Sequence, residues 1–382
     1  MKQCINIDDF TESDINLDQM VEHVFGIPRV MFRISASLIF FLFNSMSAEK
    51  IPTIFIFGDS IVDVGNNNYI NTLAKAMFPN GIDFCKNCLS GRFTNGRTVI
   101  DILEQRLGAK DFRPPYLAPN TAGDAVLRGV NYASSGSGIL NDTGLIWGGR
   151  ISLDEQISNF EETKARIVSI IGRRETKRLL KHQSLFIVVT GSNDFFLGKE
   201  TISNGSLLSS KFESQLRKLY YLEARKIIVT NIPRFGCTPF ERDKNPNAKG
   251  CIASFNEDIS SYNKRLKRLL TDLTANLTAS TFVYADIHAM LKDILQNYRS
   301  YGFENADDAC CHKVGVHGGL LPCFSLSKIC SNRTKYVFWD AFHLTETSNV
   351  IVASHMMDGG LKFMSPMNIR QLVYSSTVHP DD

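Results

Sequence analysis

Short apolar runs, rich in β-branched and aromatic residues, alternate along this chain with longer segments of helical period. Runs of this length, bounded by glycine, serine and asparagine, are typical of buried strands. We expect five strands, at residues 53–57, 128–133, 185–190, 226–231 and 281–285. Because the runs are apolar throughout, the pattern predicts a parallel sheet that is covered on both faces.

Helices are expected between and after these strands, at residues 98–107, 153–171, 207–222 and 253–277. Apolar side chains three or four residues apart give the last of these helices one buried stripe. The stripe comprises Ile259, Tyr262, Leu266, Leu269 and Leu273. Since no repeat or linker divides the chain, we predict one doubly wound α/β domain from about residue 50 to 365.

Small and polar residues follow the first three expected strands at the point where each one ends. Gly-Asp-Ser occupies 58–60, Ala-Ser-Ser-Gly-Ser-Gly occupies 133–138, and Thr-Gly-Ser-Asn-Asp occupies 190–194. The carboxyl ends of parallel strands meet at one edge of a sheet, where α/β proteins bind their ligands. A serine nucleophile needs a base and oxyanion donors, which a glycine-rich turn and an asparagine amide can supply. Taken alone, Ser60 could equally be a helix cap.

The C-terminal part of the chain offers the base. In Trp-Asp-Ala-Phe-His at 339–343, Asp340 and His343 are three residues apart, and at the start of a helix such residues share a face. Asp340 can then accept a hydrogen bond from Nδ1 of His343 and leave Nε2 directed at Ser60. Individually, Asp340 could be a helix cap, His343 a surface residue and Asn193 a turn former. Their order and their matching strand ends favour a catalytic constellation.

The N-terminal residues do not share the pattern of the rest. Residues 1–30 are acidic and lack a sustained period, after which Met-Phe-Arg at 31–33 precedes an apolar run at 34–43 and several small residues. These features describe a secretory signal peptide, and about ten apolar residues are too few for a membrane-spanning helix, which needs ~20. We expect a signal peptide at 31–48 and a non-native or disordered extension at 1–30. The alternative is a genuine extension with an internal apolar helix.

Cysteine usage agrees with secretion. Nine cysteines are present, and Cys4 lies ahead of the signal peptide. The other eight, an even number, are Cys85, Cys88, Cys237, Cys251, Cys310, Cys311, Cys323 and Cys330. In an oxidising compartment such a set predicts disulfides, and Cys237 and Cys251 bracket a polar loop that suits one bridge. In a reducing compartment, the cluster from Cys310 to Cys330, with His312 and His317, would instead suit zinc. We favour disulfides and expect no metal site.

Four Asn-x-Ser/Thr sequons lie downstream of the expected signal peptide, at Asn141, Asn204, Asn276 and Asn332. Such sequons are glycosylation acceptors in secreted proteins, so they support the same compartment. The formal net charge is only +3, and no basic run is interleaved with aromatic residues, so nothing indicates a nucleic-acid partner.

The chain resembles the plant GDSL esterase/lipase family of the SGNH hydrolase superfamily. Residues 57–68, Phe-Gly-Asp-Ser-Ile-Val-Asp-Val-Gly-Asn-Asn-Asn, are similar to its first block almost letter for letter. Its second, third and last blocks are similar to residues 129–138, 191–194 and 337–343. The resemblance implies a flavodoxin-like three-layer α/β/α fold with a parallel five-stranded sheet over residues 49–365, followed by a C-terminal tail at 366–382.

The resemblance also implies roles for individual residues. Ser60 would be the nucleophile, with Asp340 and His343 completing the triad. The oxyanion hole would comprise the N–H of Ser60, the amide of Asn193 and one glycine of the second block. Gly138 fits the family position best, and Gly136 is the alternative.

We therefore expect a secreted, monomeric esterase or lipase that hydrolyses small-molecule or lipid acyl esters through an acyl-enzyme, with no cofactor and no stable membrane insertion. One alternative is a transacylase that passes the acyl group to an alcohol on extracellular lipid, cutin or polysaccharide. Another is a catalytically silent glycoprotein that keeps the fold as a binding module; the intact triad argues against it.

Overall fold

The computed structural model describes residues 51–85, 88–197 and 205–374. The expected extension at 1–30 and signal peptide at 31–48 therefore lie outside the described residues. The described residues from Pro52 onward belong to one compact unit. Within the described ranges, no helix is both long and apolar enough to cross a bilayer.

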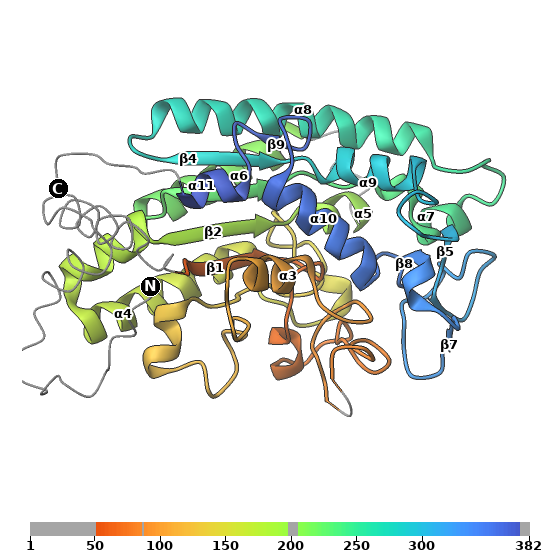
Figure 1. The fold of residues 1–382 in the computed structure, drawn as a ribbon, viewed down its shortest axis with the longest axis horizontal. Helices are drawn as coiled ribbons and strands as arrows, with labels where there is room; N and C mark the ends of the chain where they lie inside the picture. Colours follow the sequence, from red (N-terminus) through yellow and green to blue (C-terminus); the bar gives the residue numbers. More distant parts are fainter. Residues whose placement is uncertain (1–50, 86–87, 198–204, 375–382) are drawn as a thin grey trace, which may run out of the picture. The chain divides into compact units, whose positions relative to one another are not determined.

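A five-stranded sheet forms the centre of the molecule, in the order β1-β2-β3-β4-β9 (Figure 1). Its strands are β1 Thr53–Gly58, β2 Ser184–Val189, β3 Lys226–Thr230, β4 Thr281–Ala285 and β9 Met364–Ser365. The first four are parallel, with Thr53 opposite Ser184 and Lys226 opposite Thr281. The short β9 runs antiparallel to β4. Every residue of β1, β2 and β3 is buried, which explains why the interiors of these strands are apolar.

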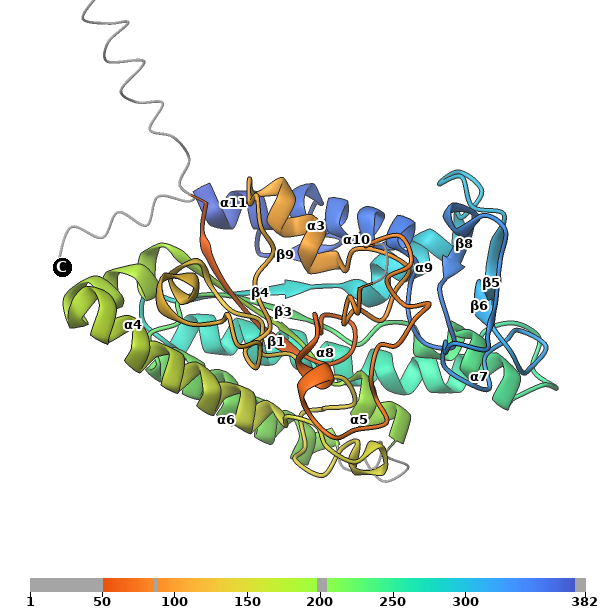
Figure 2. The same ribbon diagram turned by 90° about the horizontal axis from the view of Figure 1, so that it is seen from below.

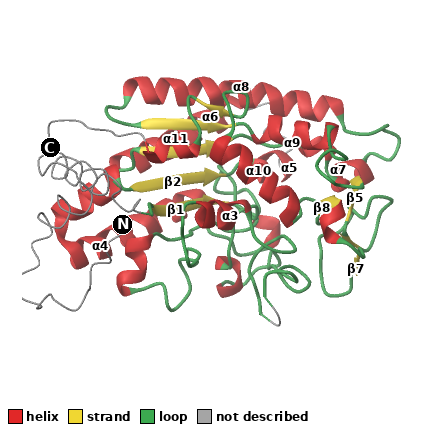
Figure 3. Cartoon of the chain, viewed as in Figure 1, coloured by secondary structure: helices red, strands yellow, loops and turns green. Residues whose placement is uncertain are grey.

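Helices cover both faces of the sheet and give three layers, as Figures 2 and 3 show. The α-helices are α3 Val99–Arg106, α4 Leu153–His182, α5 Ser192–Leu197, α6 Gly205–Tyr221, α7 Pro239–Lys244, α8 Ala253–Asn276, α9 Ile287–Gln296, α10 Glu346–Asp358 and α11 Ile369–Tyr374. Alternate strand residues such as Phe55 and Phe186 pack against α4, α6 and α8. Their neighbours, such as Ile54 and Ile187, pack against α3, α9, α10 and α11. The predicted three-layer α/β class is confirmed.

The prediction of a regular strand at residues 128–133 is wrong. The segment follows a 3₁₀ helix, Gly123–Arg128, and only an isolated bridge pairs Asn131 with Ile56. The N–H of Ile56 donates to the carbonyl of Val130, and the N–H of Tyr132 donates to that of Ile56. Gly129, at φ 110°, bends the backbone against β1, so a longer ladder does not form. The fifth strand is β9 instead, and the sheet is mainly rather than wholly parallel.

Two further boundaries differ from the sequence prediction. The helix expected at 153–171 continues to His182 across a kink at Gly172, which has φ 80°. The expected tail from residue 366 begins inside the packed molecule, because Ile369 and Leu372 of α11 are buried against the α3 side of the sheet.

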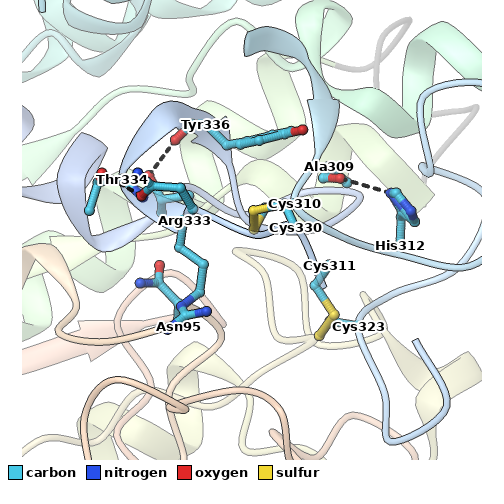
Figure 4. Close-up of a disulfide and its surroundings, with 12 residues drawn as sticks. Asn95, Ala309, Cys310, Cys311, His312, Cys323, Cys330, Arg333, Thr334 and Tyr336 are labelled. Carbon is cyan, nitrogen blue, oxygen red and sulfur yellow. Dashed lines mark hydrogen bonds between the residues drawn. A yellow bond between two sulfur atoms is a disulfide. The ribbon is translucent and has the colours of Figure 1, made fainter. Parts of the chain in front are cut away.

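Four disulfides join all eight downstream cysteines, in the pairs Cys85–Cys88, Cys237–Cys251, Cys310–Cys330 and Cys311–Cys323. The expected Cys237–Cys251 bridge is among them. The last two bridges lie side by side in a segment that leaves the sheet after α9 (Figure 4). Because these cysteines are bonded to one another, they are not available as thiolate ligands for zinc.

The segment that carries these bridges contains two small sheets. They pair β5 Asn305–Ala309 with β8 Tyr336–Phe338, and β6 Cys311–His312 with β7 Lys328–Ile329. The remaining 3₁₀ helices of the described residues are Asn66–Tyr69, Leu145–Trp147, Phe235–Cys237 and Arg333–Lys335. The guanidinium of Arg333, labelled in Figure 4, makes two hydrogen bonds of 2.6 Å to the carboxylate of Asp83. This contact ties the segment to the loop that follows β1.

Candidate active site

Ser60 stands two residues beyond the end of β1, at the carboxyl edge of the sheet. Gly58 makes the turn at φ 153°, and any side chain there would collide with the carbonyl of Val189 at the end of β2. The N–H of Asp59 donates to that same carbonyl at 3.1 Å, which anchors the turn to the neighbouring strand. Ser60 is left half-buried, so its hydroxyl reaches solvent and a neighbouring side chain at once.

His343 and Asp340 are brought to Ser60 by the loop between β8 and α10. His343 Nε2 lies 2.8 Å from Ser60 Oγ, and His343 Nδ1 lies 2.8 Å from Asp340 Oδ1. The three side chains expected to meet are therefore in one hydrogen-bonded row, although 283 positions separate Ser60 from His343.

A tight turn, and not the start of a helix, brings the side chains of Asp340 and His343 together. Asp340 Oδ1 accepts the N–H groups of Phe342 and His343 at 3.0 and 2.9 Å, and the N–H of Trp339 donates to the carbonyl of His343. Helix α10 begins only at Glu346. The expected helical spacing is thus wrong, and the carboxylate itself folds the turn that aims the imidazole.

The electrostatics of Asp340 keep it ionised. Complete burial opposes its charge, but the attraction of His343 and the hydrogen bonds from the ring and from two N–H groups outweigh burial, so the pKa of Asp340 is lowered. An ionised carboxylate only accepts hydrogen bonds, so Nδ1 of His343 carries the proton. Nε2 of a neutral ring is then an acceptor, directed at the hydroxyl of Ser60.

The disulfide-bonded segment reaches the same carboxylate. The N–H of Cys323 approaches Asp340 Oδ2 at 3.4 Å, and Cys323 is bonded to Cys311, as seen in Figure 4. Pro322 and Phe324, its two neighbours in sequence, line the hollow beside Ser60. One wall of the site therefore depends on a covalent bridge.

Hydrogen-bond donors line the same hollow as His343. Asn193, at the start of α5, lines the hollow and donates one Nδ2 hydrogen to the carbonyl of Ser137 at 2.8 Å. An amide carries two such hydrogens, so the second can serve a ligand. Gly136, at φ 83°, also lines the hollow.

Gly138 lies away from this hollow. Its Cα faces the carboxylate of Asp194, which accepts the N–H groups of Ile139 and Leu140 at 2.8 and 3.0 Å. The geometry therefore favours Gly136, the alternative of the sequence analysis, over Gly138 as the glycine that a ligand at Ser60 meets.

Residues without a sequence signal hold these loops in place. Gln156 of α4 accepts the N–H of Gly58 through Oε1 and donates through Nε2 to the carbonyl of Gly58 and the hydroxyl of Ser137. Gln156 lies 98 positions from Gly58, and no motif marks it. Asp63 lies within the first block and accepts the N–H of Ser135, and burial raises its pKa to about 6.

The hollow over Ser60 is an open crevice of about 190 Å³. Its rim is apolar and exposed, with Leu73 at 80% and Met77 at 48% exposure, and Trp147 and Phe324 lie along its sides. These rim residues carry no sequence signal, because they come from loops without a periodic pattern.

Three of the four sequons expose their asparagine: Asn141, Asn276 and Asn332. Asn204 lies outside the described residues.

Known proteins are similar over nearly the whole of the described chain. The family model described as GDSL-like Lipase/Acylhydrolase matches residues 54–356. The Arabidopsis thaliana protein GDSL esterase/lipase At4g16230 is 48% identical over 351 residues, which covers 88% of this chain and 95% of that protein. GDSL esterase/lipase At3g50400 of the same plant is 38% identical over 371 residues, covering 92% and 99%.

Proposed function

The chain belongs to the GDSL-like lipase/acylhydrolase family, and from this premise we propose that it hydrolyses carboxylic esters through an acyl-enzyme formed on Ser60. The observation that carries the proposal is the row Asp340–His343–Ser60, with both hydrogen bonds at 2.8 Å, in a crevice that also presents Gly136 and Asn193. A nucleophile, an oriented base and facing donors are the parts that acyl transfer requires.

In the first half of the reaction, Ser60 Oγ attacks the ester carbonyl while its proton passes to His343 Nε2. The imidazolium that forms is stabilised by the buried charge of Asp340. The carbonyl oxygen becomes an oxyanion, for which the N–H of Ser60, the backbone at Gly136 and the amide of Asn193 are the donors. His343 then protonates the alcohol, the carbon–oxygen bond of the ester breaks, and the acyl group stays on Ser60.

In the second half, water takes the place of the alcohol. His343 Nε2 accepts a proton from the water as its oxygen attacks the acyl carbon, and the bond to Ser60 breaks as the proton returns to Oγ. The products are the carboxylic acid and the free enzyme, so atoms and charges balance without a cofactor.

Hydrolysis of p-nitrophenyl esters by the purified protein and by a Ser60→Ala variant tests the proposal. We expect the variant to lose activity by about 10⁶-fold in kcat, because the nucleophile is lost. Its melting temperature should stay close to that of the wild type, since Ser60 is half-buried and its side chain bonds only to His343 among the contacts of the described residues. A variant that keeps activity within tenfold would contradict the role of Ser60. A wild-type protein that folds but hydrolyses none of the esters would favour the binding-module alternative.

We propose further that the protein matures in the secretory pathway. Four disulfides and three exposed sequons support this, because disulfides persist in oxidising compartments. Expression from Met31 in plant cells should release a glycosylated product that begins near Ser47 to Ile51. A product that stayed inside the cells, or whose sequenced N-terminus was still Met31, would contradict the proposal.

A further inference from the structure

A second hollow lies on the other side of the residues that hold Ser60 and His343. It has a volume of about 60 Å³ and lies between the carboxyl ends of β2 and β3 and the helices α9 and α10. Six residues line both this cavity and the open crevice: Ile61, Phe93, Ser192, Phe235, Phe342 and His343. These side chains therefore form a wall that the cavity and the crevice have in common, beside the reacting groups.

This cavity is somewhat more enclosed than the crevice. Leu291 of α9 and Val352 and Met356 of α10 form its inner wall, and their exposed fractions are 2%, 3% and 0%. Its lining is mainly aliphatic and aromatic, although it includes the buried hydroxyl of Thr190, which has no hydrogen-bond partner among the described residues. Such a cavity suits an apolar chain better than a polar group, which would have to give up its water.

The order of the reaction decides which part of an ester fits here. The alcohol must leave after the first step, and water must then reach His343, so the alcohol belongs in the open crevice. The acyl group stays bonded to Ser60 until the last step, so it can occupy the more enclosed and mainly apolar space. Two of the residues that line both hollows lie directly beside the nucleophile. Ile61 follows Ser60 in the chain, and His343 is the hydrogen-bond partner of Ser60.

We propose that this cavity binds the acyl chain of the ester and that Met356 sets the length of chain it accepts. The inference rests on the proposed function and specifies its substrate class as esters of short unbranched fatty acids. One water needs ~10–15 Å³ of such volume, so the cavity holds a chain of about five heavy atoms. Activity should then be highest for acyl groups of about four to six carbons.

Helix α10 supplies a matched control. Met356 and Met357 are adjacent, both 0% exposed and both part of the core on the α3 side of the sheet. Only Met356 lines the cavity. Met356→Ala and Met357→Ala therefore remove the same three side-chain atoms from the same core, but only the first enlarges the proposed acyl site.

The experiment measures kcat/KM for p-nitrophenyl acetate, butyrate, octanoate and decanoate with the wild type and both variants. Met356→Ala should raise the octanoate-to-butyrate ratio by about tenfold or more, because each added methylene in an apolar pocket changes kcat/KM by about that much. Met357→Ala should leave the ratio within about twofold of the wild type. A second series, acetates of alcohols of increasing length, should respond equally in all three proteins.

Each contrary outcome has a distinct meaning. An unchanged acyl profile for Met356→Ala, or an equal shift for Met357→Ala, would overturn the assignment while the ester hydrolase itself stands. A shift confined to the alcohol series would also overturn it, because the cavity would then hold the leaving group. If the alanine variants do not fold, Val352→Leu, which fills the cavity, should lower the octanoate-to-butyrate ratio, and no change there would overturn the proposal. A wild type inactive on every ester would instead be a failure of the proposed function.

Discussion

At the scale of single residues, Asp59 has the least favourable surroundings in the loop that presents Ser60. It is fully buried; Oδ1 accepts the N–H of Ile61 at 3.0 Å, and Oδ2 has no hydrogen-bond partner in the described part of the chain. Burial raises its pKa to about 7, although the hydrogen bond from Ile61 and the nearby His343 oppose the rise. A carboxyl group buried in this way is compatible with the folded state when it is protonated, and it destabilises the folded state when it is charged.

This charge makes stability depend on pH. The pKa of Asp59 is about 7 in the folded chain and 3.8 by its ordinary value, so between these values the folded chain binds the proton more tightly. Stability is therefore lost as the pH rises through this window, and the loss is complete above pH 7. The stability lost in this way is at most on the order of 4 kcal/mol, since each unit of difference between the two pKa values corresponds to about 1.4 kcal/mol.

Asp59→Asn should remove this dependence, since the amide keeps the acceptor for Ile61 and carries no charge. We expect its melting temperature to exceed that of the wild type by several degrees at pH 8 and to match it near pH 4.5. Thermal unfolding from pH 4.5 to 9 measures the difference. Asp258→Asn, an exposed site on α8, is the control and should show no such trend. Equal melting temperatures of the wild type and Asp59→Asn at every pH would mean that burial does not raise the pKa of Asp59 and that its charge does not destabilise the folded protein.

At the scale of elements, the disulfide-bonded segment forms part of the site. Cys311–Cys323 and Cys237–Cys251 span 12 and 14 positions, so loss of either should cost a similar stability, about 3 kcal/mol for loops of this length. Only the first touches the crevice, through Cys323 and its N–H near Asp340.

The two bridges can therefore be compared directly. The double variant Cys311→Ala/Cys323→Ala should lower kcat by roughly tenfold, because the backbone N–H of residue 323 is no longer held near Asp340 and the crevice loses a fixed wall. The variant Cys237→Ala/Cys251→Ala should lower the unfolding midpoint about as much but keep kcat within about twofold. Ester hydrolysis and urea unfolding of both proteins provide the two measurements. Equal losses of kcat in both variants would contradict a specific link between the Cys311–Cys323 bridge and the site.

Elements with a local signal could be predicted from the sequence, and those that depend on distant contacts could not. The strands β1 to β4 are mostly apolar because helices cover both of their faces, and that pattern is visible in the chain. The segment at 128–133 looks equally apolar, but Gly129 bends it out of a regular ladder. The two-residue strand β9 is too short to carry any period.

At the scale of the whole molecule, part of the site could be predicted from the sequence because parallel strands end at the same edge of the sheet. Ser60 and Asn193 follow β1 and β2, so parallel pairing alone brings them together, and the Asp-x-x-His spacing supplies Asp340 and His343. The choice of Gly136 over Gly138 depends on Asp194, which holds the loop from outside the crevice. The role of Gln156 likewise depends on contacts across the fold, so no local pattern reveals it.

The central claim, that Ser60 is the nucleophile of an acyl-transfer site, is tested most directly by covalent labelling. A fluorophosphonate reacts with an activated serine: the oxygen bonds to phosphorus and fluoride leaves. The account predicts that peptide mass spectrometry of the labelled protein finds one adduct, on Ser60, and that His343→Ala prevents it by removing the base. A folded protein that forms no adduct, or one that carries the adduct on another serine of the crevice such as Ser135 or Ser192, would contradict the account.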